Sequence, residues 1–234
     1  MALYAIGDLH LSFSSDKPMD VFGENWNDYE NKIKAYWEAN IKETDTVLIP
    51  GDISWAMRLS DALIDLEWIH KLPGRKILLR GNHDYWWASL KKLQALYDDM
   101  DFLQNNFYEY KSEEDTFAIC GTRGWLCPNP NKFDENDQKI YERELLRLKL
   151  SLDAAKKAGH ENFIVMTHYP PTNDMKERSG FLEVYEAYGV KKVIYGHLHS
   201  EYAFQTGLQG EHEGVVYQLT SCDYLNFQAL KIID

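Results

Sequence analysis

The chain has few cysteines, no excess of positive charge and no long apolar run. Its three cysteines, Cys120, Cys127 and Cys222, form no CxxC pair. An odd number without such a pair indicates reduced thiols rather than a disulfide framework or a zinc-thiolate site. No apolar run is long enough to cross a bilayer. No basic segment followed by an apolar stretch precedes the first predicted strand, as a secretory signal would. These absences predict a cytoplasmic location and no membrane contact.

The shortage of positive charge limits the partners that we expect. The chain has 37 acidic side chains against 25 Lys and Arg, which gives a formal net charge of -12. Extended binding to DNA or RNA needs a basic face, so this balance argues against it. A small nucleotide or a short strand remains compatible with it. Bound metal ions, which need anionic ligands, would offset part of the negative charge.

The order of the predicted elements indicates an α/β protein. The length of 234 residues and the apolar content of 44% favour one globular domain over residues 1–234. Short apolar runs predict strands at residues 3–6, 46–49, 76–79, 107–110, 116–120, 163–167, 192–195, 202–205, 215–219 and 227–233. Helical spacing of apolar residues predicts helices at residues 26–41, 59–70, 85–97 and 136–158. The early alternation of strand and helix predicts a parallel sheet with helical crossovers.

The unusual residues follow the predicted strands. Four strands end in a glycine followed by residues that can bind metals, and a fifth ends in Thr-His; the five motifs are GDLH at 7–10, GDIS at 51–54, GNHD at 81–84, TH at 167–168 and GHLH at 196–199. Sites in open α/β sheets form at the carboxyl ends of the strands, so these side chains are expected to converge. Any one motif alone reads as a turn, and a lone HxH is more often structural than a ligand pair. Together they are hard to explain structurally, because buried Asp and His clusters are costly without a metal.

The combination of Asp, Asn and His favours a divalent metal centre. Oxygen and imidazole ligands suit Mn, Fe or Zn. A carboxylate has two oxygens and can bridge two ions. Two ions about 3.5–4 Å apart can clamp the attacking and leaving oxygens of a displacement, and they make a bound water acidic.

The five motifs, in this order from Gly7 to His199, resemble those of the calcineurin-like metallophosphoesterase superfamily. The resemblance implies an α/β (α+β) fold, a four-layer αββα sandwich of two mixed sheets flanked by helices, which periodicity alone does not give. It also implies two divalent ions, with Mn as the first expectation. By the pattern of the family, the ligands would be Asp8, His10 and His199 for the first ion, Asn82, His168 and His197 for the second, and Asp52 as a bridge between them.

The resemblance also assigns catalytic roles. His83 matches the histidine that contacts the phosphate and helps to protonate the leaving group, and Asp84 matches the acidic residue that orients it. The Asp-Arg-Gly element of the protein Ser/Thr phosphatases is missing after Asp52, which removes the usual phosphate-binding arginine. Arg123, in a loop flanked by glycines, is the candidate replacement. An arginine at the surface of a loop, without a contact to phosphate, is an equal alternative interpretation.

The aromatic residues beside the motifs have two interpretations. They are Trp55, Tyr85, Trp86, Trp87, Trp125 and Tyr169. Most are expected to pack around the site, with one or two in a substrate cleft.

The expected function is hydrolysis of a phosphomonoester or phosphodiester in a small phosphorylated substrate. A hydroxide bound by both metals would attack phosphorus directly, with His83 assisting the leaving group and no phosphoenzyme. Two alternatives stay open: a non-catalytic metal-binding scaffold of the same fold, and a nuclease. The sequence leaves the substrate, the native metals and the oligomeric state undetermined.

Overall fold

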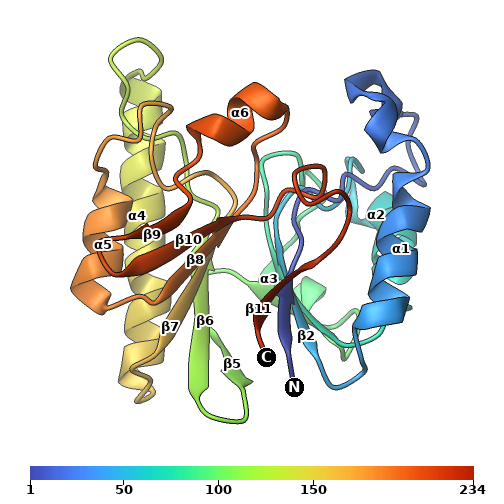
Figure 1. Cartoon of the computed structure of the whole chain (residues 1–234), viewed down its shortest axis with the longest axis horizontal. Helices are drawn as coiled ribbons and strands as arrows, with labels where there is room; N and C mark the ends of the chain where they lie inside the picture. Colours follow the sequence, from blue (N-terminus) through green and yellow to red (C-terminus); the bar gives the residue numbers. More distant parts are fainter.

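Two β-sheets pack face to face in the structure, a computed structural model that describes residues 1–234 (Figure 1). The first sheet has the strand order β11-β1-β2-β3-β4. Its strands are β1 (Leu3–Ala5), β2 (Thr46–Pro50), β3 (Arg75–Leu79), β4 (Met100–Leu103) and β11 (Leu230–Ile233). The second sheet has the order β5-β6-β7-β8-β10-β9. Its strands are β5 (Tyr108–Lys111), β6 (Thr116–Thr122), β7 (Phe163–Thr167), β8 (Lys192–Tyr195), β9 (Gly210–His212) and β10 (Val215–Leu219).

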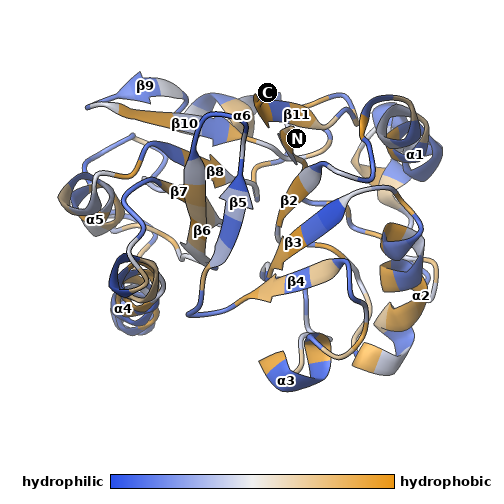
Figure 2. Cartoon of the chain, turned by 90° about the horizontal axis from the view of Figure 1, so that it is seen from below, coloured by the Kyte–Doolittle hydropathy of each residue, from blue (hydrophilic) through white to orange (hydrophobic).

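Helices cover the outer face of each sheet. Figure 2 shows α1 (Tyr29–Asn40) and α2 (Leu59–His70) outside the first sheet, and α4 (Glu135–Lys157) and α5 (Gly180–Tyr188) outside the second. The remaining helices are short: α3 (Leu90–Leu93), α6 (Glu201–Thr206) and the 3₁₀ turns η1 (Met19–Phe22) and η2 (Glu24–Trp26). Both sheets mix parallel and antiparallel pairs. The predicted αββα sandwich is therefore confirmed.

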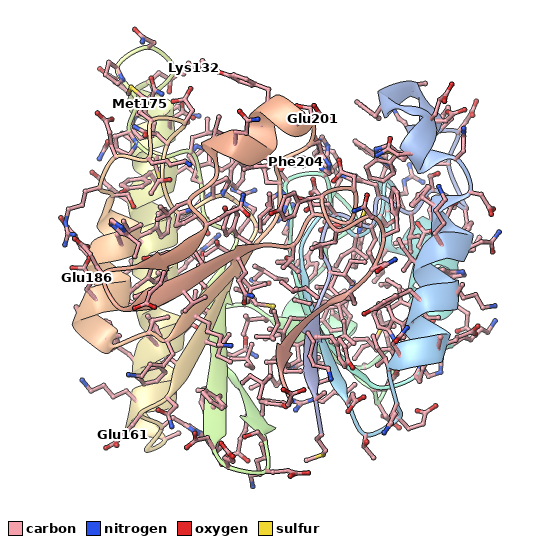
Figure 3. The ribbon with its side chains drawn as sticks, in the orientation of Figure 1. Lys132, Glu161, Met175, Glu186, Glu201 and Phe204 are labelled. Atoms are coloured by element: carbon pink, nitrogen blue, oxygen red, sulfur yellow. The ribbon has the colours of Figure 1, made fainter.

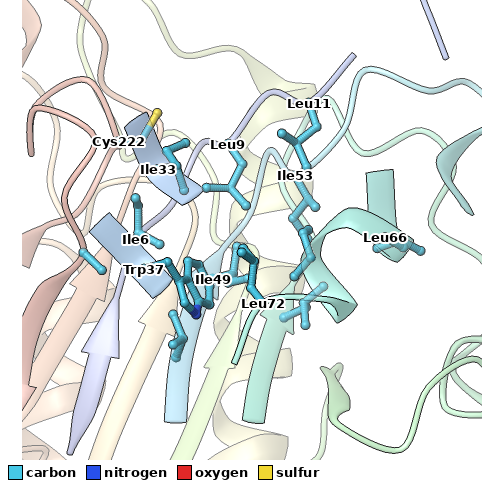
Figure 4. Packing of buried hydrophobic residues seen from close by; sticks show 14 of the residues in the cluster. Ile6, Leu9, Leu11, Ile33, Trp37, Ile49, Ile53, Leu66, Leu72 and Cys222 are labelled. Atoms are coloured by element: carbon cyan, nitrogen blue, oxygen red, sulfur yellow. The ribbon is translucent and has the colours of Figure 1, made fainter. Parts of the chain in front are cut away.

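The central strands are buried on both faces, which explains their continuous apolar sequences. Alternate side chains of a strand point to opposite faces. On β2, Val47 and Ile49 face the helices α1 and α2, where Trp37 packs (Figure 4), whereas Leu48 faces the second sheet. A strand in this position has no face for polar side chains, so the polar residues gather where the strands end.

Most predicted elements are confirmed, and two were wrong. The helix predicted at 85–97 is only the short α3, because the segment before it is held in turns: the indole of Trp86 donates to Asp84 Oδ1 (3.0 Å) and that of Trp87 to Gln104 Oε1 (3.0 Å). The strand predicted at 202–205 is the helix α6. The Ser200 side chain caps this helix by accepting from the Ala203 amide, a signal that the alternation of aromatic residues obscured.

The sequence analysis missed the strands β4 and β9, the helix α5 and the two 3₁₀ turns η1 and η2. Helix α5 has a clear start signal, since the Ser179 hydroxyl accepts from the Leu182 amide. The three cysteines are buried and form no disulfide. None of the helices combines the length and the apolar character that a membrane span needs.

Candidate metal centre

The predicted ligand motifs meet at one edge of the sandwich. Each motif follows the carboxyl end of a strand: β1, β2 and β3 of the first sheet, β7 and β8 of the second. The two sheets contact each other here, because the Gly7 amide after β1 donates to the Thr220 carbonyl after β10, and the Cys222 amide donates to the Gly7 carbonyl. Residues far apart in the sequence are thereby brought together.

The backbone at this edge is strained. Asp8, His10, Asp52 and His197 adopt φ angles of +56°, +46°, +49° and +73°, in the left-handed region. Such a conformation is uncommon outside glycine and costs on the order of 1–3 kcal/mol per residue. Four strained residues with ligand-type side chains in one place point to a functional site rather than to ordinary turns.

Two groups of donor atoms form at this edge. Asp8, His10 and His199 make up the first, and Asp52, His168 and His197 the second; within each group the donor atoms lie within 4.8 Å of one another. In the first group, Nε2 of His10 lies 3.2 Å from Nε2 of His199. This spacing of imidazole nitrogens and a carboxylate fits a divalent ion.

Asn82 and Asp52 complete the arrangement. Asn82 Oδ1 lies 2.6 Å from Nε2 of His168 and 3.0 Å from Nδ1 of His197, so it belongs to the second group. Asp52 Oδ2 lies 3.4 Å from His168 Nε2 and 3.8 Å from His10 Nε2. This carboxylate therefore stands between the two groups, where a bridging ligand would be.

Close packing holds the carboxylates in place. The His197 amide donates to both oxygens of Asp8 (3.0 and 2.9 Å), and the His83 amide donates to Asp52 Oδ1 (2.8 Å). A Cβ atom added to Gly196 would overlap Oδ2 of Asp8, and one added to Gly81 would overlap Oδ1 of Asp52. Glycine is required at both positions because the backbone runs directly against a carboxylate.

Burial shifts the pKa values of the carboxylates upward. It raises the pKa of Asp8 and Asp52, and with the negative charge of Asp52 it raises the pKa of Asp84 to about 7. A buried carboxylate without a cation favours its protonated form. These groups therefore gain most from a bound cation.

The histidines of the centre differ in the direction in which their pKa values are shifted. Burial lowers the pKa of His10 and His197, and it lowers that of His168 to about 3, so these rings stay neutral and keep a lone pair for a metal. Burial alone would also lower the pKa of His199. The hydrogen bond to Asp223 and the charges of Asp8 and Asp223 outweigh burial and raise this pKa to about 9.

Asp223 is a functional candidate that the sequence analysis missed. It lies four residues after β10 and accepts from Nδ1 of His199 at 3.0 and 3.1 Å. The sequence around Asp223 contains neither the Gly-Asp nor the His-x-His pattern of the other strand ends. Its position after a strand of the second sheet was the only signal available.

His83 and Asp84 do not form the expected pair. His83 lies beside the two donor groups, with its ring 5.9 Å from that of His10 and 4.4 Å from that of Trp55. The Asp84 carboxylate is occupied elsewhere. It accepts from the amides of Ile53 and Gly81 (2.9 and 2.7 Å) and from the Trp86 indole. Asp84 thus joins the turns after β2 and β3, and the expectation that it orients the ring of His83 is not met.

A cleft of about 650 Å³ opens over the centre. His10, Asp52, His83, His197 and His199 lie on its floor, and its walls carry Met19, Phe22, Trp26, Trp55 and Phe204. Figure 3 shows Phe204 and Glu201 on α6, at the end of the molecule where the strands finish. Of the aromatic residues singled out in the sequence, Trp55 lines this cleft, whereas Trp86 is buried in the core.

Arg123 lies outside this cleft. Its carbonyl accepts from the amides of His168 and Tyr169 (3.0 Å each), while its guanidinium carbon lies 4.7 Å from the centre of the Trp125 ring. The side chain borders another cavity, next to α4. The expectation that Arg123 contacts a phosphate at the metal ligands is therefore not supported by its position.

Comparison with known proteins places the chain in a family. Residues 1–201 match the model of the calcineurin-like phosphoesterases, so the chain belongs to that family. This confirms the resemblance seen in the motifs.

The chain is also similar to individual proteins. It is 31% identical over 77 residues to the Gene 66 protein of Mycobacterium phage L5; the match covers 33% of this chain and 37% of that relative. Among solved structures, phosphopantetheinyl hydrolase (PptH) of Mycobacterium tuberculosis shares the fold with a TM-score of 0.62 at 13% identity, covering 99% of this chain and 95% of that one. TT1561 of Thermus thermophilus does so with a TM-score of 0.60 at 10% identity, covering 99% and 97%. At these identities the structural likeness shows the fold alone.

Proposed function

We propose that this chain hydrolyses a small phosphate monoester or diester with the help of two divalent metal ions. The observation that carries the proposal is the pair of donor groups with the Asp52 carboxylate between them. Asp8, His10 and His199 would hold one ion, Asn82, His168 and His197 the other, and Asp52 both. When bound, the ions would neutralise the phosphoryl oxygens and bring the pKa of a water close to neutrality.

His83 is the proton donor to the leaving group in this proposal. It borders the cleft without belonging to either donor group. Its ring packs against Trp55, which holds it in the lining of the cleft. A protonated imidazole can give its proton to the departing alkoxide and recover one from solvent.

The walls of the cleft favour a substrate with an apolar or planar alcohol portion. Phe22 is largely exposed at the rim, and Trp26 and Phe204 border the space above the ligands. Contact with such a group would remove apolar surface from water, at about 25 cal/mol per Å².

Two alternatives predicted from the sequence remain testable. A scaffold without activity would explain the fold, yet every ligand type and His83 are present. A nuclease would need a basic surface, and the lining of this cleft includes the acidic Glu201 and Asp223 and no Lys or Arg. Manganese as the native metal, a cytoplasmic location and a single domain over residues 1–234 stay predictions.

The experiment that tests the proposal measures metal content and turnover in one preparation. The purified protein is loaded with Mn and assayed with an aryl phosphomonoester and an aryl phosphodiester. We expect close to two metal ions per chain and turnover of one ester over the other. Bound metal without turnover of either ester, or of a panel of alkyl and nucleotide esters, would favour the scaffold.

A further inference from the structure

A second cavity lies between the two sheets and α4, next to the metal centre but separate from it. Its volume is about 260 Å³, and none of its lining residues borders the metal cleft. It forms where β3, β4 and β6 end. Four arginines line it: Arg80 after β3, Arg123 after β6, and Arg143 and Arg147 on α4.

The one carboxylate in this cavity is already occupied. Glu144 is buried, with 1% of its side chain exposed. It accepts from the Thr122 hydroxyl at 2.6 Å and from Arg147 at 2.8 Å, and it pairs with Arg143 at 3.2 Å. These contacts attach α4 to the end of β6. They give both arginines of α4 a carboxylate partner. The other two arginines of the cavity, Arg80 and Arg123, do not share it.

Arg80 and Arg123 form no ion pair. Arg80 donates through Nε to the Asp84 carbonyl at 3.2 Å. Nε of Arg123 is buried and has no hydrogen-bond partner. A buried donor on a charged group without a partner costs free energy, so a partner is expected to fill this place.

The charges around Arg123 also favour the binding of an anion. Burial lowers the pKa of Arg123, the charge of Glu144 raises it, and the charges of Arg80 and Arg143 lower it again. Four cationic groups thus converge with one carboxylate. Guanidinium groups bind phosphate and carboxylate through two parallel hydrogen bonds, and this chemistry is the one that the cavity offers.

We propose that this arginine cavity is a second binding site, for a tetrahedral oxyanion of the phosphate class. Arg80 and Arg123 donate to the anion, and Arg143 and Arg147 add positive charge at the mouth. The volume is below the range of about 300–1,000 Å³ typical of larger ligands. It therefore fits inorganic phosphate or the phosphoryl end of a small molecule whose remainder lies along Trp87.

The inference does not depend on the proposed function, because no metal ligand borders the cavity. An anion here would contact the segments that carry Asn82 and His168, since Arg80 precedes the first by two residues and the Arg123 carbonyl accepts from the amide of the second.

Equilibrium dialysis of the metal-loaded protein against radiolabelled inorganic phosphate tests the proposal. The wild type is expected to bind one phosphate in the cleft and another in the arginine cavity. The double variant Arg80→Gln/Arg123→Gln should lose only the second, and Asp52→Asn should lose only the first. Arg58→Gln, at an exposed arginine before α2, is the matched control and should retain both.

Further measurements test whether the variants are folded and which anion the cavity binds. Circular dichroism of each variant checks that it is folded. Arg123→Lys keeps the positive charge but loses the planar set of N–H donors, and it should weaken phosphate binding at the second site about tenfold. Replacing phosphate by phenylphosphonate, which is not hydrolysed, separates the two sources: tighter binding indicates a phosphorylated molecule, and equal or weaker binding indicates free phosphate. A wild type that binds phosphate only at the site removed by Asp52→Asn, or a folded double variant that still binds both, would overturn the proposal.

Discussion

Nδ1 of His199 lies 3.0 Å from Oδ1 and 3.1 Å from Oδ2 of Asp223. The carboxylate fixes the orientation of the ring and holds a proton on Nδ1, which directs Nε2 towards His10 and Asp8. In metal sites such a partner orients the ligand and raises its basicity.

Asp223→Ala is therefore expected to weaken metal binding by about 10- to 100-fold without unfolding the protein. Competition with a chromophoric chelator measures the affinity. Asp20→Ala removes an exposed aspartate of η1 and serves as the control. Equal affinity in Asp223→Ala and the wild type would show that Asp223 has no part in the centre.

The raised pKa of His199 predicts a pH dependence of the metal-free protein. Its folded value of about 9 lies above the ordinary value of 6.5, so the folded state binds the proton more tightly than the unfolded state does. The stability from this group is fully present below about pH 6.5 and is lost as the pH rises through about 9. Urea unfolding in the presence of a chelator should show this decline.

The decline should be smaller in Asp223→Asn, which lacks the charge that raises this pKa. It should also be weaker in the metal-loaded protein, because a metal ligand must be unprotonated. A decline of the same size in all three samples would assign it to another group.

Asp52→Asn should change stability in opposite directions with and without metal. Asp52 is buried near Asp8 and Asp84, where burial raises the pKa of both carboxyl groups and the negative charge of Asp52 raises it further. Removing this charge relieves the metal-free protein, while Asn keeps an oxygen for the His83 amide. With metal, the variant loses an anionic ligand and hence the stabilisation that comes from binding.

Thermal unfolding with chelator and with Mn measures this difference. The melting temperature of Asp52→Asn should equal or exceed that of the wild type in chelator and fall below it in Mn. Asp16→Asn, at an exposed site, should follow the wild type in both. A lower value for Asp52→Asn in both conditions would contradict a metal-binding role that depends on its charge.

The gathering of the candidate ligands at one edge could be predicted because their motifs are local and follow strands with continuous apolar sequences. Asp8, Asp52 and His168 each come directly after such a strand, and the carboxyl ends of these strands share one edge. The resemblance of the motifs to a family supplied the sandwich, since the pairing of strands depends on contacts far apart in the sequence.

Other features could not be read from the sequence. The segment 85–97 has helical spacing, but hydrogen bonds of Trp86 and Trp87 to distant groups hold its first part in turns. Asp84 is one residue from His83, yet its carboxylate serves the amides of Ile53 and Gly81. Some of these hydrogen-bond partners lie far apart in the sequence, so they are set by the tertiary structure and not by local spacing.

Gly196→Ala should disrupt the first donor group. Its Cβ would overlap Oδ2 of Asp8, which is fully buried and cannot move aside freely. Overpacking of this kind costs about 1–3 kcal/mol. We expect lower stability in urea and loss of one bound metal ion, measured by elemental analysis. Gly159→Ala is the control: it strains a left-handed backbone (φ +94°), but nothing lies within 4 Å of the added atom, so metal content should stay unchanged.

His83→Ala separates proton donation from metal binding. Because His83 belongs to neither donor group, the variant should bind the same amount of metal as the wild type. Its kcat should fall by about 100- to 10,000-fold for esters of alkyl alcohols, whose leaving groups need a proton. For nitrophenyl esters, whose leaving group departs as a stable anion, the loss should be much smaller. His212→Ala, at an exposed position of β9, should change neither value. An equal loss for both kinds of ester, with the metal content retained, would mean that His83 acts on the phosphoryl group itself rather than on the leaving oxygen.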